Sequence, residues 1–318
     1  MFLEHATECT VLLEDYLKKD HSAHSVKKLT FAGAGDKDVY NISAPFMDEA
    51  GKLIAGRIEA RDSEDAIVGF FEEEENVWNL REDLPMFPLQ DPFVTRINGL
   101  LVFGGVEVIK NSDGGVTWRT ILYKGRTIKT LARFFEGPVG MKDLRLGQLI
   151  GGSILVLTRP QGLKGGRGKI GYFMIDSLDE LDCRKIEDAP LLQGHFAEGE
   201  WGGANEILPL RNGDAGVLGH IAYFDKKGDR HYFPMTFAFD PATGFHTPIE
   251  IIATRSHFLD GPSKREDLKD IVFSGGGLRQ MDGTFVLYAG TSDTEAQTMV
   301  MGDPFVKYET DDLLIENI

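Results

Sequence analysis

The stretch that decides the fold reads Leu89-Gln-Asp-Pro-Phe-Val-Thr-Arg-Ile-Asn-Gly-Leu-Leu-Val-Phe-Gly-Gly-Val106. Two apolar segments flank Asn98-Gly99, a dipeptide typical of a tight hairpin turn, so the stretch predicts two antiparallel strands. Asp91 stands directly before Pro92 at the start of the first strand, and a proline biases the preceding residue toward extended backbone. A carboxylate held there can cap a turn or act as an acid catalyst, and the stretch alone favours the turn cap.

The same pattern, a glycine-containing turn between two apolar strands, recurs along the chain. Such turns occur at 49–51, 98–99, 151–152, 212–213 and 282–283. Their spacing of about 50 to 70 residues fits the repeated sheets of a β-propeller, whereas a sandwich requires no such long-range recurrence. No linker rich in Pro, Ser or charge interrupts the series. We therefore expect an all-β protein, a five-bladed β-propeller forming one domain over 1–318.

The amino-terminal segment has a different pattern. From about Ala6 to Leu29 apolar residues recur at helical spacing, with Val11, Leu12 and Tyr16 on one stripe. The sequence thus predicts a short helical extension over about 1–30, preceding the propeller.

Composition excludes several classes of function. The 318 residues carry a formal net charge of −16, which disfavours general binding to a nucleic-acid backbone but leaves room for a small anion in a locally basic pocket. Two cysteines are too few for a disulfide framework, and no apolar run reaches membrane-spanning length. We expect a cytoplasmic protein that binds neither membranes nor nucleic acid. Homo-oligomer formation is left open.

Polar residues follow apolar strands in three successive repeats. Arg159 comes after the strand over 153–157, His220 after 217–218, and Asp293 soon after 285–289. Each of them alone is most simply structural. Because equivalent positions of propeller blades converge on one axial cavity, their recurrence predicts a common site.

Alternating charges mark a fourth strand. Arg57, Glu59 and Arg61 share one face at strand period, which fits either a solvated edge or the lining of a cavity that binds sugar hydroxyls and phosphate. The glycine runs at 33–35 and 165–169 lack the strand-to-helix setting of a phosphate loop and are interpreted as flexible turns. No nucleophile elbow, Cys-His pair or metal-ligand spacing is present.

Several of these segments resemble a known family. Residues 57–62 (Arg-Ile-Glu-Ala-Arg-Asp) and 90–97 (Gln-Asp-Pro-Phe-Val-Thr-Arg-Ile) resemble two motifs of glycoside hydrolase family 130, which are five-bladed propellers and mostly β-mannoside phosphorylases. Weaker matches at 39–44, 159–160, 219–220, 270–276 and 287–294 follow in the same order. Gln90 and Phe93 depart from the motif. The departures are similar to a sister group, the β-1,2-mannosyltransferase/phosphorylases of glycosyltransferase family 108.

The resemblance implies a mechanism and a set of site residues. Asp91 would be the general acid, acting through a sugar hydroxyl while phosphate attacks the anomeric carbon with inversion, so that no second catalytic carboxylate is required. No cofactor or metal is implied; inorganic phosphate is the co-substrate and a mannose-containing oligosaccharide the partner. The implied phosphate ligands are Lys142, Arg159 and His220. The implied sugar ligands are Asn41, Arg57, Arg61, Asp143, Asn205 and Asp293.

The expected function is therefore an inverting β-1,2-mannosyl phosphorylase or mannosyltransferase. One alternative is an inverting β-mannosidase, which needs a carboxylate base, with Glu198, Glu200 or Glu206 as candidates. Another is a sugar-binding propeller without catalytic activity.

Overall fold

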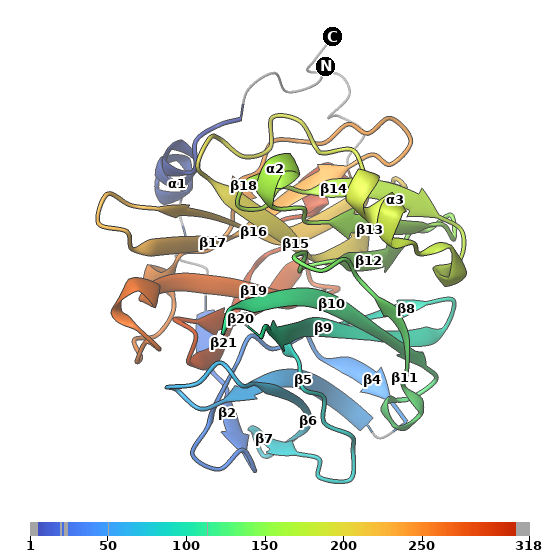
Figure 1. Ribbon diagram of the computed structural model, residues 1–318. Helices are drawn as coiled ribbons and strands as arrows, with labels where there is room; N and C mark the ends of the chain where they lie inside the picture. The colour runs from blue at the N-terminus through green and yellow to red at the C-terminus, as the bar shows by residue number, and fades with distance from the viewer. Residues whose placement is uncertain (1–5, 20, 22–24, 50, 113, 310–318) are drawn as a thin grey trace.

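The strands form five mostly antiparallel blades that follow one another in chain order around an axis (Figure 1). The computed structural model describes residues 6–19, 21, 25–49, 51–112 and 114–309. Two parallel residue pairs between β17 and β19 join the fourth blade to the fifth in one continuous sheet. The fold is a five-bladed β-propeller, as the turn spacing predicted.

Each blade is assembled from consecutive strands. Blade 1 contains β2 (Thr30–Ala32), β3 (Asp38–Tyr40), β4 (Phe46–Asp48), β5 (Gly51–Glu59), β6 (Ile67–Glu74) and β7 (Val77–Leu80). Blade 2 contains β8 (Gln90–Ile97), β9 (Leu100–Lys110), β10 (Val116–Gly125) and β11 (Ala132–Glu136). Blade 3 contains β12 (Arg145–Gln148), β13 (Ile154–Thr158) and β14 (Gly171–Ile175).

Blades 4 and 5 complete the ring. Blade 4 contains β15 (Trp201–Pro209), β16 (Ala215–Phe224), β17 (Arg230–Phe239) and β18 (Glu250–Ile251). Blade 5 contains β19 (Asp270–Arg279), β20 (Thr284–Thr291) and β21 (Glu295–Gly302), to which β1 (Ser25–Lys28) pairs antiparallel. An amino-terminal strand thus closes the last blade.

Short helices lie in the connections. The α-helices are α1 (Cys9–Leu17), α2 (Gly162–Gly165) and α3 (Cys183–Asp188). Single 3₁₀ turns occur at η1 (Ile128–Thr130), η2 (Leu178–Glu180), η3 (Arg255–His257), η4 (Glu266–Leu268) and η5 (Val306–Tyr308). The Asp182 side chain begins α3 by accepting hydrogen bonds from the backbone N–H groups of Arg184 and Lys185.

The prediction of a continuous amino-terminal helix was wrong. The helix ends at Leu17, and the predicted helical residues from Ser25 onward form β1. Pairing of β1 with the distant β21 supplies backbone hydrogen bonds that local helical propensity does not override. Residues 1–5, 20 and 22–24 of the predicted extension lie outside the described residues.

The five predicted turns all connect strands of one blade. They join β4 to β5, β8 to β9, β12 to β13, β15 to β16 and β19 to β20; Ala50 in the first lies outside the described residues. Asn98 and Gly99 have φ of 51° and 76°, the left-handed values that a two-residue hairpin turn of this type requires. These turns lie at one end of the blades. The second strand of a blade runs from its turn to the opposite end, and there, at or just beyond the strand's last residue, lie Glu59, Arg159 and Asp293.

In four of the five blades the first part of the sheet is irregular at one point. In β8 the register shifts between Gln90 and Phe93, in β15 between Ala204 and Glu206, and in β19 between Ser274 and Gly276. In blade 1, β3 and β4 pair with the two ends of β5, and the chain between them, 41–45, leaves the ladder. These bulges release side chains from the sheet where the blades meet.

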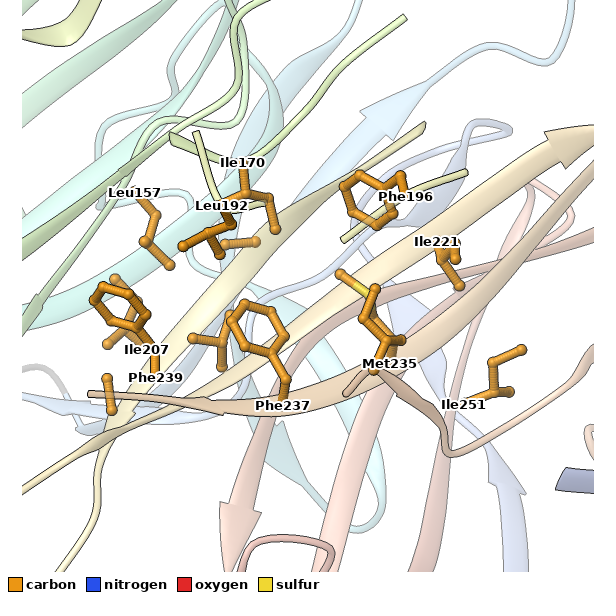
Figure 2. Packing of buried hydrophobic residues seen from close by; sticks show 14 of the residues in the cluster. Leu157, Ile170, Leu192, Phe196, Ile207, Ile221, Met235, Phe237, Phe239 and Ile251 are labelled. Carbon is orange, nitrogen blue, oxygen red and sulfur yellow. The ribbon is translucent and has the colours of Figure 1, made fainter. Parts of the chain in front are cut away.

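Apolar side chains fill the spaces between neighbouring blades. Figure 2 shows the cluster between blades 3 and 4, where Leu157 and Ile170 approach Phe237 and Phe239. Further clusters join the other neighbouring blades. Packing on both faces of each sheet fixes the blades, and with them the bulged positions.

Candidate active site

Asp91 lies at the bulge of β8 and is held by two residues of blade 1, Asn41 just after β3 and Arg57 in β5. Its Oδ1 accepts hydrogen bonds from Asn41 Nδ2 at 2.8 Å and Arg57 Nη1 at 3.0 Å, and the residue is 6% exposed. The φ of Asp91 is 48°, so the expectation of extended backbone before Pro92 was wrong. The bulge turns the backbone into the left-handed region, where Asp is among the few residues other than glycine that are tolerated.

The same backbone conformation recurs at other candidate positions. Asn41, Asp143 and Asp293 have φ of 44°, 60° and 53°. Each such residue costs of order 1–3 kcal/mol and persists only where the surroundings enforce it, a pattern associated with functional sites. No pattern in the sequence indicated this backbone conformation.

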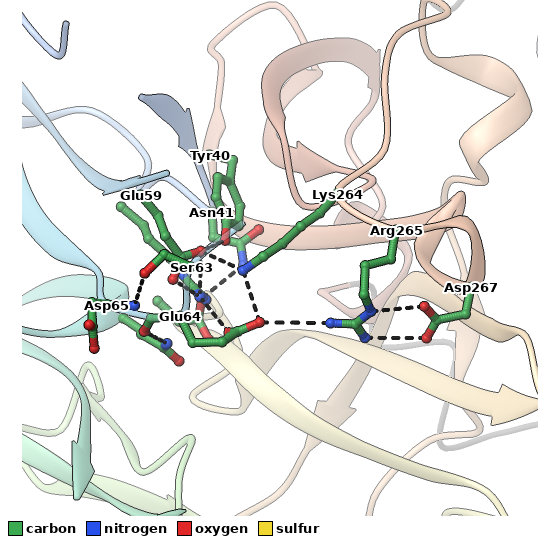
Figure 3. Close-up of polar contacts among 12 residues, drawn as sticks. Tyr40, Asn41, Glu59, Ser63, Glu64, Asp65, Lys264, Arg265 and Asp267 are labelled. Atoms are coloured by element: carbon green, nitrogen blue, oxygen red, sulfur yellow. Dashed lines mark hydrogen bonds and ion pairs between the residues drawn. The ribbon is translucent and has the colours of Figure 1, made fainter. Parts of the chain in front are cut away.

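Glu59 is a buried carboxylate that orders the side of the site next to Asp91. Its two oxygens accept hydrogen bonds from Arg57 Nη2, both at 2.9 Å, and Tyr40 donates a short hydrogen bond to it. Lys264, reaching in from the β18–β19 connection, donates to Glu59 at 2.8 Å and pairs with Glu64 at 3.0 Å (Figure 3). Arg57 is thus held between Glu59 and Asp91.

A second group of buried side chains contains Asp143 and two arginines, Arg159 and Arg145. Arg159 Nη1 lies 3.3 Å from Asp143 Oδ2, and its Nε donates to the Gly202 carbonyl at 2.7 Å. Arg145 lies 3.8 Å from Asp143, donates to the Asn205 carbonyl at 3.0 Å and packs over the Phe93 ring. Asp143, predicted as a sugar ligand, therefore orients two buried guanidinium groups.

His220 contributes a neutral ring to this group. Its Nδ1 lies 2.8 Å from Asn205 Oδ1, which also accepts from Ser274. Burial lowers the pKa of His220 to about 3, against the opposing effect of Asp143. At neutral pH it offers a hydrogen-bonding nitrogen and no charge, so the predicted cationic clamp has its charge on Lys142 and Arg159. His220 also lies within β16, which continues to Phe224, and not at a strand end as predicted.

Lys142 lies between the two groups. It is half-buried and makes no hydrogen bond or ion pair with any residue that the structure describes. Its charge lowers the pKa values of both Asp91 and Asp143 and disfavours protonation of His220. An unpaired ammonium so placed is available to an anion.

The carboxyl groups differ in protonation. Burial raises the pKa of Asp91, but Arg57, Lys142 and the Asn41 hydrogen bond outweigh it and hold the pKa below its ordinary value. For Asp143 burial is likewise outweighed, mainly by Arg159 and Lys142, and the pKa is about 2. Burial together with the nearby Asp91 raises the pKa of Asp293, although Arg57 acts in the opposite direction.

Several polar atoms of the cluster are buried without a hydrogen-bond partner among the described residues. They are Asn41 Oδ1, Arg57 Nε, Asp143 Oδ1 and Asn205 Nδ2. Such atoms are rare in folded proteins because each costs desolvation energy. Their concentration here points to a polar ligand that hydrogen-bonds to donors and acceptors alike.

Not every predicted residue joins the cluster. Arg61 pairs with Asp38 at 2.8 and 2.7 Å, and its side chain is 47% exposed. Arg61 lies just beyond the end of β5, where the strand alternation that placed it on the Arg57 face no longer holds. A cavity of about 190 Å³ and another of about 660 Å³ are lined by other residues, the larger by Arg255, Lys269 and Ser292 among others, and no residue of the cluster lines either of them.

The three candidate bases of the hydrolase alternative lie in different places. Glu200 accepts from the backbone N–H groups of Cys9 and Ala197, and Glu198 is exposed. Glu206 follows the bulge of β15 and accepts from the Gly277 N–H at 2.7 Å. Burial raises the pKa of Glu206 to about 7, although the hydrogen bond opposes the shift.

The strand pattern had revealed Glu59, since it alternates with Arg57 and Arg61. Tyr40, Lys264 and Arg145 were missed. Lys264 belongs to an irregular connection without periodicity, and Arg145 carried no motif.

Among the described residues, no group of three or more His, Cys, Asp or Glu side chains is arranged to hold a metal ion, and no helix is long and apolar enough to cross a membrane.

Comparison with protein families decides the affiliation. The family described as "Protein of unknown function (DUF1861)" matches residues 15–307. The chain belongs to the DUF1861 family. No curated protein sequence matches it. The DUF1861 match covers all five blades and every candidate residue named above.

Two solved structures from Leishmania mexicana are similar to this DUF1861 protein over nearly its whole length. One is MPT-4, a mannose phosphorylase in complex with a phosphate ion: 32% identity, 94% of this chain and 95% of that chain covered, TM-score 0.85. The other is MPT-1, a GDP-Man-dependent mannosyltransferase: 31% identity, 95% and 96% covered, TM-score 0.86. These matches confirm the resemblance to the mannosyltransferase/phosphorylase group.

A more distant structure shares the fold. The β-1,2-mannobiose phosphorylase of Listeria innocua is 14% identical, with 92% of this chain and 95% of that chain covered and a TM-score of 0.59. At this identity the similarity concerns the propeller alone.

Proposed function

We propose that this protein is an enzyme that reversibly transfers a β-linked mannosyl unit between a mannoside and inorganic phosphate, with Asp91 as the general acid and base. The observation that carries the proposal is the position of Asp91. It lies between a group rich in hydroxyl-binding side chains and an unpaired cation, Lys142, beside Arg159. The phosphate-bound mannose phosphorylase at 32% identity supports the assignment.

The two groups match the two halves of such a substrate pair. Asn41, Arg57 and Asp293, with both donors and acceptors, suit the hydroxyls of a mannosyl ring. Lys142, Arg159 and the neutral His220 suit a phosphate, which accepts hydrogen bonds from cations and can donate one when singly protonated. Asn205 and Asp143 position His220 and Arg159. We propose no cofactor beyond phosphate.

In phosphorolysis the protonated Asp91 carboxyl supplies a proton, through a sugar hydroxyl, to the glycosidic oxygen. The bond from that oxygen to the anomeric carbon breaks, and a phosphate oxygen bonds to the carbon from the opposite face. In synthesis the Asp91 carboxylate takes the proton of the acceptor hydroxyl. The lowered pKa of Asp91 suits the synthetic direction, and the negative charge of bound phosphate raises this pKa for phosphorolysis.

The test is incubation with β-1,2-mannobiose in the presence and absence of phosphate. We expect mannose 1-phosphate only with phosphate. Formation of free mannose at the same rate in both samples refutes phosphorolysis and leaves the β-mannosidase alternative, whose base would have to be Glu206. No turnover together with mannobiose binding identifies a sugar-binding propeller.

A second donor is favoured by one comparison. The sequence of this protein is 31% identical to that of the GDP-Man-dependent transferase and 32% identical to that of the phosphorylase, so sequence identity does not distinguish the two. The same cationic group could hold a nucleotide-activated mannose, so the choice between phosphate and a nucleotide leaving group is part of the same test.

A further inference from the structure

The glycine-rich run at 165–169 belongs to a connection that packs directly on Arg159. Arg159 Nη2 lies 3.4 Å from the Arg167 carbonyl, which also accepts from Gln161 Nε2 at 2.8 Å. The Gly168 carbonyl accepts from the Gly202 N–H at 3.2 Å. The run was interpreted as a flexible turn, but these contacts hold it over the candidate phosphate site.

Glycine is required at two positions of this connection for space. A Cβ on Gly168, where φ is 143°, would lie 2.6 Å from Arg159 Nε, and a Cβ on Gly165 would lie 1.8 Å from the Pro160 carbonyl oxygen. The glycines therefore allow the backbone to cover Arg159 closely. They explain the motif without a P-loop.

The Arg167 side chain extends from this connection onto blade 4. Its guanidinium lies 4.8 Å from the centre of the Phe224 ring and 5.5 Å from that of Trp201. Arg230 also lies over the Phe224 ring, 5.7 Å from its centre. Arg167 is exposed and has no carboxylate partner among the described residues, although the chain carries a net charge of −16.

Trp201 connects this surface to the candidate phosphate site. Trp201 Nε1 donates to Tyr232 Oη at 3.0 Å, and the Tyr232 ring stacks on His220 with a centroid distance of 5.6 Å. The Arg167 carbonyl is in contact with Arg159, so the Arg167 side chain starts beside the candidate phosphate site. A second guanidinium group anchored there can contact a phosphate that is linked to one bound by Arg159.

We propose that Arg167, held over Phe224 and Trp201 by the glycine-rich connection, forms an outer anion subsite that binds the second phosphate of a diphosphate whose first phosphate occupies the Lys142–Arg159 site. The inference rests on the proposed function. It adds an organic diphosphate, as the leaving group of an activated mannose, to the substrates of that site, and it makes Arg167 a specificity-determining residue.

The corresponding transfer balances without another reactant. The bond between the anomeric carbon and the diphosphate oxygen breaks, and its electron pair leaves with the diphosphate. The acceptor hydroxyl oxygen bonds to the anomeric carbon, and its proton passes to the ionised Asp91 carboxylate. Arg167 stabilises the charge that develops on the departing diphosphate.

The test uses inorganic pyrophosphate and inorganic phosphate as probes, with binding measured by calorimetry on the full-length protein. We expect wild type to bind pyrophosphate more tightly than phosphate. Arg167→Ala should weaken pyrophosphate binding about tenfold, the loss of one charge-assisted contact, and leave phosphate binding unchanged within about twofold. Arg167→Lys keeps the charge but not the planar fork, so its affinity for pyrophosphate should fall between those of wild type and Arg167→Ala.

Arg126→Ala is the matched control, since it removes an exposed arginine charge on blade 2 and should change neither affinity. Equal pyrophosphate affinity in wild type and Arg167→Ala overturns the inference. An equal loss for both probes also overturns it, because Arg167 then merely supports Arg159. Failure of the proposed function is a separate result, absence of phosphate-dependent mannose 1-phosphate formation by wild type, and the pyrophosphate comparison stays decisive in that case.

Discussion

Replacing Glu59 with glutamine is the most informative single perturbation of the site, because one buried carboxylate holds two cations. The Glu59 side chain is fully buried, and those of Arg57 and Lys264 are 6% and 5% exposed. Glu59→Gln preserves the shape and removes the charge. Arg57 then retains Asp91 at 3.0 Å, and Lys264 retains Glu64 at 3.0 Å.

The expected cost follows from these contacts. Removing one partner of a buried ion pair typically costs about 3–5 kcal/mol, since the other charge is left buried. Each cation here keeps a second carboxylate, which places Glu59→Gln near the lower limit, at about 3 kcal/mol. For a chain of this size that loss corresponds to a fall in melting temperature of about 4–5 °C.

Urea unfolding of Glu59→Gln and Glu64→Gln checks this reasoning. Both carboxylates contact Arg57 and Lys264, but the Glu64 side chain is 63% exposed. Glu64→Gln should therefore cost no more than about 1 kcal/mol. Unfolding free energies of the two variants that agree within about 0.5 kcal/mol would refute the claim that burial of Glu59 makes it the anchor of the network.

Three further predictions concern the neighbouring groups. Asp91→Asn should fold like wild type and lower kcat about 10²- to 10⁴-fold, the usual contribution of a general acid, in the mannobiose assay; near-wild-type turnover would make Asp91 structural. Lys142→Met should raise the KM for phosphate more than that for mannobiose, whereas Arg61→Ala, which removes a surface ion pair, should change neither. Glu206 has a pKa raised to about 7 when folded against about 4.5 when unfolded, so wild type loses stability as pH rises through this window, by about 3 kcal/mol in total. Glu206→Gln lacks this loss, and its stability relative to wild type should therefore be higher at pH 8 than at pH 5 in urea unfolding; an equal difference at both pH values would contradict the assignment.

The features that sequence reasoning predicted are local ones. The hairpin at Asn98-Gly99 depends only on two residues that tolerate positive φ, and all five turns of this kind connect strands as expected. The pairing of Arg57 and Glu59 on one face follows from strand period. These relations are fixed within a few residues, so the pattern contains them.

The features that were missed depend on contacts between distant segments. β1 leaves its helical pattern because it pairs with β21 at the other end of the chain. Lys264 reaches Glu59 across 205 positions. Gly219 resembled a strand end, but it lies inside β16, and it is a glycine because a Cβ there would meet the Gly203 carbonyl oxygen at 2.4 Å. Single-strand patterns contain no information on such approaches between neighbouring strands.

The protonation states depend on the assembled site as well. His220 carries no charge at neutral pH because it is buried, and Asp91 is ionised because Arg57 and Lys142 outweigh its burial. Residue identity alone suggested the opposite for His220. The division of the site into a hydroxyl-binding group and an anion-binding group became visible only from these contacts.

The proposed reaction is a single inverting transfer to phosphate at Asp91. NMR of the first turnovers of β-1,2-mannobiose with phosphate assigns the anomer of the initial product. We expect α-mannose 1-phosphate, formed only when phosphate is present. Initial formation of the β-anomer, or of free mannose independent of phosphate, would contradict it.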